Sequence, residues 1–129
     1  MATHLTRILY VEDEPDIRAI GKMALEAVGG FEVVACASGA EALAAAAAAK
    51  PDLLLLDVMM PGMDGPATLK ALRATSLNAD TPAIFMTAKV QSNEVAHFKA
   101  LGALAVIPKP FDPMQVSDEI RRIWCARPS

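Results

Sequence analysis

Five polar side chains each stand one or two positions after the end of a short apolar run: Glu12, Asp13, Asp57, Thr87 and Lys109. If the runs are parallel strands, their carboxyl ends meet at one edge of a sheet. In open α/β folds this edge is where ligands bind. The spacing therefore predicts a single pocket that holds three carboxylates, a hydroxyl and an ammonium group.

The predicted pocket has the chemistry of a site for a divalent cation and a phosphoryl group. Three neighbouring carboxylates repel one another by several kcal/mol at an effective dielectric of about 20, and Lys109 offsets only part of that. Mg²⁺ commonly binds one or two carboxylates together with waters and phosphate oxygens. A carboxylate beside such an ion, a lysine and a threonine is a suitable phosphoryl acceptor, which makes Asp57 the candidate. A solvated loop rim would explain Glu12 or Lys109 taken singly, but not the whole set.

The apolar runs are expected to be strands of one parallel sheet. Several are continuous rather than alternating, as in strands that are buried on both faces. The runs cover residues 8–11, 31–35, 53–56, 83–86 and 104–107. The run at residues 31–35 ends near Cys36 and adds no polar group of this kind.

Helix signals lie between the runs. Pro15 suits a first helical position, and Ser38 with Glu41 forms a capping box. The first helix has a predicted apolar stripe at Ile17, Ile20, Ala24 and Val28, ending at Gly29-Gly30. Further helices are predicted from residue 65, from about residue 92, and from a cap at Asp112, with Val116, Ile120 and Ile123 facing inward. Five βα units with right-handed crossovers predict a doubly wound α/β sheet.

Composition limits the class of protein. A chain of 129 residues with 53% hydrophobic and 21% charged residues is expected to fold as one domain, residues 1–129 with a core of about 6–125 and no output domain. The net charge is −3 and the Lys and Arg residues are scattered, which predicts no nucleic-acid surface. The apolar stretches are too short for membrane insertion. Cys36 and Cys125 form no CxxC motif and are interpreted as small hydrophobes in a reducing cytoplasm, so a cytoplasmic location is expected.

Four segments together resemble the signature of bacterial two-component response-regulator receiver domains. They are Glu12-Asp13-Glu14-Pro15, the sequence DVMMPGMDG from Asp57 to Gly65, Thr87-Ala88, and Lys109-Pro110-Phe111. The resemblance covers essentially the whole chain, with all motifs in order. It implies a flavodoxin-like, five-stranded parallel sheet with strand order 2-1-3-4-5. It also implies a cis peptide bond between Lys109 and Pro110, a tight turn that brings the lysine back over Asp57.

The resemblance assigns a role to each polar residue of the pocket. Asp57 would accept a phosphoryl group from the phosphohistidine of a sensor histidine kinase or a phosphotransfer protein. Thr87 and Lys109 would contact the phosphoryl oxygens. The implied ligands of Mg²⁺, with Mn²⁺ as an alternative ion, are Asp13, Asp57 and the backbone carbonyl of Met59, with Glu12 acting through water.

Several functions are compatible with the fold. The leading hypothesis is a phosphoacceptor signalling domain, not an enzyme, that acts through contacts with an unidentified protein target. A phosphorelay carrier and an unphosphorylated partner-binding module are the alternatives. A haloacid-dehalogenase-type phosphatase needs a second Asp where Met59 stands, and a flavodoxin-like phosphate loop would not carry Glu12-Asp13-Glu14.

Two positions depart from the family pattern, and both bear on output. Val106 stands where the family often has an aromatic residue, and Lys89 where it often has an acid. The kinase is expected to dock beside Asp57, on Ile17, Ile20 and Pro110-Phe111. Ordinary core packing is the alternative reading of these apolar residues.

Overall fold

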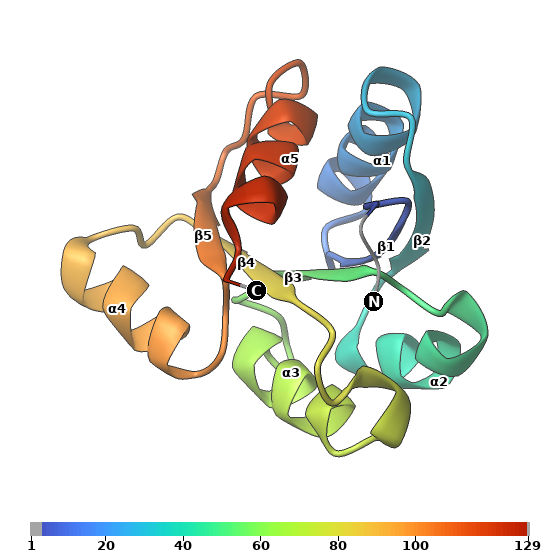
Figure 1. The fold of residues 1–129 in the computed structure, drawn as a ribbon, viewed down its shortest axis with the longest axis vertical. Helices are drawn as coiled ribbons and strands as arrows, with labels where there is room; N and C mark the ends of the chain where they lie inside the picture. The colour runs from blue at the N-terminus through green and yellow to red at the C-terminus, as the bar shows by residue number, and fades with distance from the viewer. Residues whose placement is uncertain (1–3, 129) are drawn as a thin grey trace.

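The computed structural model describes residues 4–128, so residues 1–3 and 129 of the predicted domain lie outside the described part. Its strands form one parallel sheet in the order β2-β1-β3-β4-β5, which confirms the predicted fold class (Figure 1). The strands are β1 (Arg7–Val11), β2 (Glu32–Cys36), β3 (Leu53–Asp57), β4 (Ala83–Thr87) and β5 (Ala105–Pro108). The helices are α1 (Pro15–Met23), α2 (Gly39–Ala49), α3 (Gly65–Arg73), α4 (Ser92–Ala100) and α5 (Val116–Ala126).

The sheet lies between two helical layers, with α1 and α5 on one face and α2, α3 and α4 on the other (Figure 1). Successive residues of a strand point to opposite faces, so each strand contributes to two cores. In β1, Leu9 belongs to the core under α2 and α3, whereas Tyr10 belongs to the core under α1 and α5. All five residues of β3 are buried, which explains the continuous apolar run in the sequence.

The predicted apolar stripe of the first helix is wrong at two of its four positions, Ile20 and Val28. Ala24 is buried, but Ile17 is only half-buried, and Ile20 and Val28 are each 46% exposed. Gly21 and Leu25 face the sheet instead. A Cβ at Gly21 would stand 2.3 Å from the Tyr10 hydroxyl oxygen, so only glycine allows this close approach of α1 to β1. A π-helical turn, Ala24–Val28, then extends the helix and shifts its register.

The fifth helix begins later than predicted. The Asp112 carboxylate accepts a hydrogen bond of 2.8 Å from the backbone N–H of Met114, and α5 starts only at Val116. Asp112 thus caps a preceding turn. Val116 and Ile120 are buried as expected, Ile123 is half-buried and packs against the same core, and Trp124 is a further buried residue of the helix.

The capping signals of the second helix are largely confirmed. Ser38 Oγ accepts a hydrogen bond of 3.1 Å from the backbone N–H of Glu41, while the Glu41 carboxylate reaches the N–H of Ala37. The helix ends at Lys50, which adopts the left-handed conformation with φ 46°. A 3₁₀ turn, Ser76–Asn78, follows α3.

The two cysteines lie in different environments. Cys36 is buried, which suits its interpretation as a small hydrophobe, whereas Cys125 is exposed on α5. Within residues 4–128, no helix has both the length and the apolar character that crossing a membrane requires.

Candidate functional site

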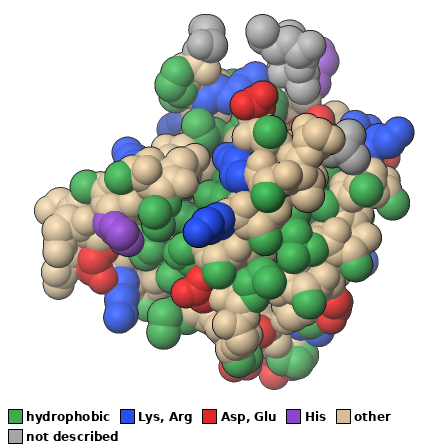
Figure 2. Space-filling model, turned by 90° about the horizontal axis from the view of Figure 1, so that it is seen from below, with side chains coloured by type: hydrophobic (Ala, Val, Ile, Leu, Met, Phe, Trp, Pro, Cys, Tyr) green, Lys and Arg blue, Asp and Glu red, His purple; other side chains and the backbone are tan. Residues whose placement is uncertain are grey.

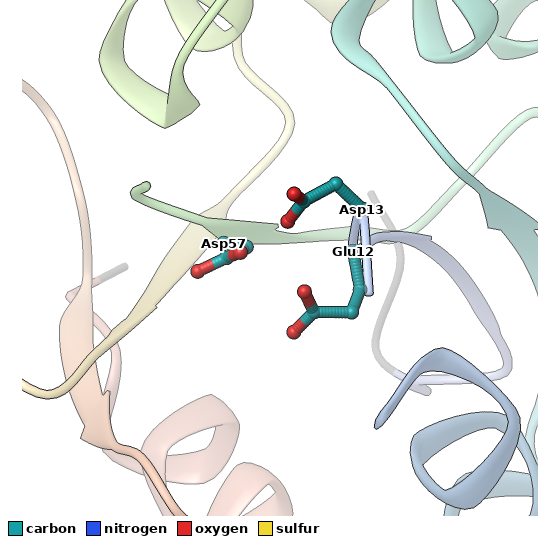
Figure 3. A group of neighbouring side chains, drawn as sticks. All are labelled: Glu12, Asp13 and Asp57. Carbon is teal, nitrogen blue, oxygen red and sulfur yellow. The ribbon is translucent and has the colours of Figure 1, made fainter. Parts of the chain in front are cut away.

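The five polar residues predicted to converge do lie together at the carboxyl edge of the sheet. Glu12 and Asp13 follow β1, Asp57 ends β3, and Thr87 ends β4. Lys109 follows β5 and completes the group. The carboxyl groups of Glu12 and Asp13 both point toward Asp57 (Figure 3). Strand order explains the convergence, because β3 lies between β1 and β4.

An open cavity of about 190 Å³ is lined by four of these side chains, all but Glu12. Its lining residues are Asp13, Glu14, Asp57, Met59, Thr87, Ala88 and Lys109. The side chain of Met59 is 66% exposed at the rim, whereas Asp57 at the base is only 3% exposed. The cavity is therefore an opening from solvent to a buried carboxylate.

Lys109 bridges two buried carboxylates. Its Nζ lies 2.7 Å from Glu12 Oε1 and 3.3 Å from Asp57 Oδ1. Glu12 is fully buried, and the lysine side chain is 17% exposed. The Lys109–Pro110 peptide bond is cis, as the resemblance implies.

The electrostatics of the pocket disfavour a charged Asp57. Burial, followed by the negative charge and hydrogen bond of Glu12, raises the pKa of Asp57 to about 7, although Lys109 opposes the shift. Burial would lower the pKa of Lys109, but the hydrogen bond to Glu12 and the charge of Asp57 raise it above its ordinary value. A cation that binds beside Asp57 would therefore displace its proton and stabilise the carboxylate.

The donor set fits a hard divalent cation. Glu12, Asp13 and Asp57 each offer a carboxylate oxygen, and these oxygens lie within 4.8 Å of one another. Oxygen donors at such spacing suit Mg²⁺, which keeps several of its waters and needs few protein ligands. One ammonium group beside three carboxylates leaves an excess of negative charge for the ion to neutralise.

Thr87 lines the cavity. Its side chain is 2% exposed, and Oγ1 accepts a hydrogen bond of 3.1 Å from the backbone N–H of Lys89. The Thr87 carbonyl accepts a hydrogen bond of 2.9 Å from the N–H of Lys109, which ties the ends of β4 and β5 together.

Two further residues support the site in ways that the sequence analysis did not predict. Arg18 on α1 donates to the main chain of the loop that carries Glu12 and Asp13. Gly65 lies so close to Asp57 that a Cβ would stand 2.5 Å from the aspartate carbonyl oxygen. The glycine therefore lets the loop after β3 close back under the site.

The chain belongs to the response regulator receiver domain family, whose model matches residues 8–121. Receiver domains are signalling domains of two-component systems.

Two proteins and one solved structure illustrate the relationship. The DNA-binding response regulator MtrA of Mycolicibacterium smegmatis is 35% identical over 94% of this chain and 51% of its own. The alkaline phosphatase synthesis transcriptional regulatory protein PhoP of Bacillus subtilis is 37% identical over 91% of this chain and 48% of its own. The chain thus spans about half the length of these relatives. Chemotaxis protein CheY4 of Vibrio cholerae is 33% identical with a TM-score of 0.84, over 93% of this chain and 99% of that one.

Proposed function

We propose that Asp57 accepts a phosphoryl group from the phosphohistidine of a sensor histidine kinase or phosphotransfer protein. The observation that carries this proposal is the contact of 3.3 Å between Lys109 Nζ and Asp57 Oδ1 at the base of an open cavity. Of Glu12, Asp13 and Asp57, only Asp57 is the last residue of a strand. Its strand, β3, lies between β1 and β4 in the sheet.

In the proposed transfer, a carboxylate oxygen of Asp57 bonds to phosphorus as the phosphorus–nitrogen bond of the phosphohistidine breaks. The leaving imidazole keeps the electron pair and takes a proton from solvent. Lys109 neutralises charge on one phosphoryl oxygen, and the Thr87 hydroxyl donates to another.

The proposed Mg²⁺ ligands are Asp13, Asp57 and the backbone carbonyl of Met59, with Glu12 acting through water. When bound, the ion would neutralise charge on the phosphoryl oxygens. The domain changes only its own Asp57, so we class it as a phosphoacceptor and not as an enzyme.

We further propose that output passes through contacts of the receiver domain with another protein. On the face formed by α2, α3 and α4, Lys and Arg side chains are mixed with acidic and apolar ones (Figure 2). Such a surface does not favour a nucleic-acid contact. MtrA is named a DNA-binding response regulator and PhoP a transcriptional regulatory protein, and each is about twice as long as this chain. CheY4 is a chemotaxis protein of about this size. A phosphorelay carrier is the second candidate, because Val106 replaces the aromatic residue frequent in the family.

We propose that the kinase docks on α1 and on the loop after β5. Ile20 and Met23 on α1 are 46% and 62% exposed, so core packing does not explain them. Ile17 and Phe111 are half-buried and are shared between core and surface.

Labelling with a small phosphodonor tests the proposal. Phosphoramidate with Mg²⁺ should add one phosphoryl group, detected as a mass increase that hydroxylamine reverses. Asp57→Asn and EDTA should each abolish the increase. A phosphoryl group that persists on the Asp57→Asn variant would refute the assignment.

A further inference from the structure

The loop that joins β1 to α1 carries Glu12 and Asp13, two of the three carboxylates of the site. A side chain of α1, Arg18, donates hydrogen bonds to the main chain of this loop. The carbonyl oxygens of Glu12 and Asp13 accept hydrogen bonds from Arg18 Nη1 at 2.9 Å and 3.4 Å. The carbonyl oxygen of Glu14 accepts the main-chain N–H of the same arginine at 2.8 Å. Arg18 therefore holds three consecutive carbonyl groups of this loop.

Two main-chain N–H groups of the loop make further hydrogen bonds, and neither of these ties the loop to α1. The N–H of Glu12 donates to the carbonyl of Cys36 at 3.0 Å, which extends the pairing of β1 with β2. The N–H of Glu14 donates to the Glu12 carboxylate at 3.2 Å, which is a bond within the loop. The side chain of Arg18 is thus the support that reaches the loop from a helix.

Arginine suits this place for a geometric reason. A single terminal nitrogen of the guanidinium carries two N–H groups in a rigid plane, so it can reach two successive carbonyls at once. Arg18 is half-buried, and its backbone is fixed in the second turn of α1. The positive charge also lies against two carbonyl dipoles, which strengthens both hydrogen bonds.

We propose that Arg18 is a positioning residue for divalent-cation binding, because it fixes the main chain of Glu12 and Asp13 with both carboxylates directed toward Asp57. Arg18 contacts the loop main chain rather than the carboxylates that would bind the ion. The inference rests on the proposed function, since it concerns the same metal site. Residues that support metal ligands in this way typically contribute a factor of about 10–100 in metal affinity.

Three variants test this role. Arg18→Met removes the donors and keeps the chain length, and Arg18→Lys keeps the charge with a different donor geometry. Arg122→Met removes an exposed arginine of α5 and is the matched control. The Mg²⁺ dissociation constant is measured by ¹⁵N NMR titration at constant ionic strength. We expect it to rise about tenfold for Arg18→Met and about threefold for Arg18→Lys, and to stay unchanged for Arg122→Met.

A kinetic measurement separates positioning from loss of fold. In phosphoramidate labelling of Arg18→Met, the half-saturating Mg²⁺ concentration should rise by the same factor of about ten. The rate at saturating Mg²⁺ should stay within about twofold of the wild type, since the ion restores the loop. A rate that saturating Mg²⁺ fails to restore would overturn the positioning role.

The remaining outcomes are equally decisive. A dissociation constant of Arg18→Met within twofold of the wild type would overturn the inference, and so would an equal weakening in Arg122→Met. If Arg18→Met fails to fold, Arg18→Lys decides by the same criterion. If the wild type itself binds no Mg²⁺, the proposed function fails as well. If the wild type binds Mg²⁺ and Arg18→Met binds it with the same dissociation constant, only the proposed role of Arg18 is refuted.

Discussion

Lys109 Nζ lies 2.7 Å from Glu12 Oε1, although 97 residues separate the two in the sequence. The glutamate is fully buried, so the ammonium group is its main charge partner. Asp57 shares the same ammonium at 3.3 Å. The structure therefore places two buried carboxylates on one lysine, which links the stability of the domain to the chemistry of the site.

Removal of the lysine should destabilise the domain through Glu12. Lys109→Met is expected to lower the free energy of unfolding by about 2–3 kcal/mol at pH 7, because a buried carboxylate loses its partner. The double variant Lys109→Met/Glu12→Gln should recover most of that loss. Urea denaturation of both variants checks this, and equal instability of the two would contradict a role for the pair.

The raised pKa of Asp57 predicts how stability depends on pH. Its pKa of about 7 lies above the ordinary value of 3.8, so the folded state binds more protons than the unfolded state between these values. Stability without Mg²⁺ should therefore fall as the pH rises from about 4 to about 7, and then level off. At pH 7.5, Asp57→Asn should be more stable than the wild type by about 1–3 kcal/mol.

Urea denaturation in EDTA at pH 5 and pH 7.5 measures this difference. Mg²⁺ should stabilise the wild type and narrow its gap to Asp57→Asn, since only the carboxylate offers the ion a full ligand. A gap that is the same at both pH values would exclude Asp57 as the titrating group.

The sheet and the meeting of its polar residues could be predicted from sequence because each depends on a simple pattern. Strands buried on both faces appear as continuous apolar runs, and the residue after each run must lie at the carboxyl edge. The inward face of α1 could not be predicted in the same way. Gly21 adds nothing to a hydrophobic pattern, yet it packs against Tyr10 because it lacks a side chain. Arg18 was missed because an arginine on a helix gives no sign that its partners are loop carbonyls.

The end of α2 offers a test of backbone strain away from the site. Lys50 has a φ of 46°, a conformation that favours glycine. Lys50→Gly should raise the free energy of unfolding by about 0.5–1 kcal/mol, whereas Lys50→Ala should give no such gain. Thermal denaturation compares the two variants, and a similar gain from alanine would show that strain is not the cause.

The docking face predicts a kinase-specific defect. Ile20→Lys should slow phosphoryl transfer from the cognate kinase about tenfold or more, while labelling by phosphoramidate remains normal. Val28→Lys is the matched control, since Val28 is also 46% exposed but lies in the π-helical turn at the far end of the helix. Equal losses with both donors would mean that Ile20 serves the fold and not docking.

We expect the conformational change that follows phosphorylation to pass from Thr87 to α4 through the aromatic pair Phe85 and Phe98, and not through residue 106. Phe85 precedes Thr87 by two residues on β4, and its ring lies edge-on to that of Phe98 on α4, with centroids 5.4 Å apart. Val106 on β5 stands beside Phe85 in the sheet, half-buried, and has no ring to swing inward. A shift at the end of β4 would therefore reach α4 through the Phe85–Phe98 contact.

Beryllofluoride with Mg²⁺ should move the amide resonances of α4 in the wild type. Phe98→Leu, which loses a ring contact of about 0.5–1.5 kcal/mol, should reduce these shifts without weakening beryllofluoride binding. Unchanged α4 resonances in the wild type would favour a phosphorelay carrier, which needs the chemistry of Asp57 and a docking face but no switch.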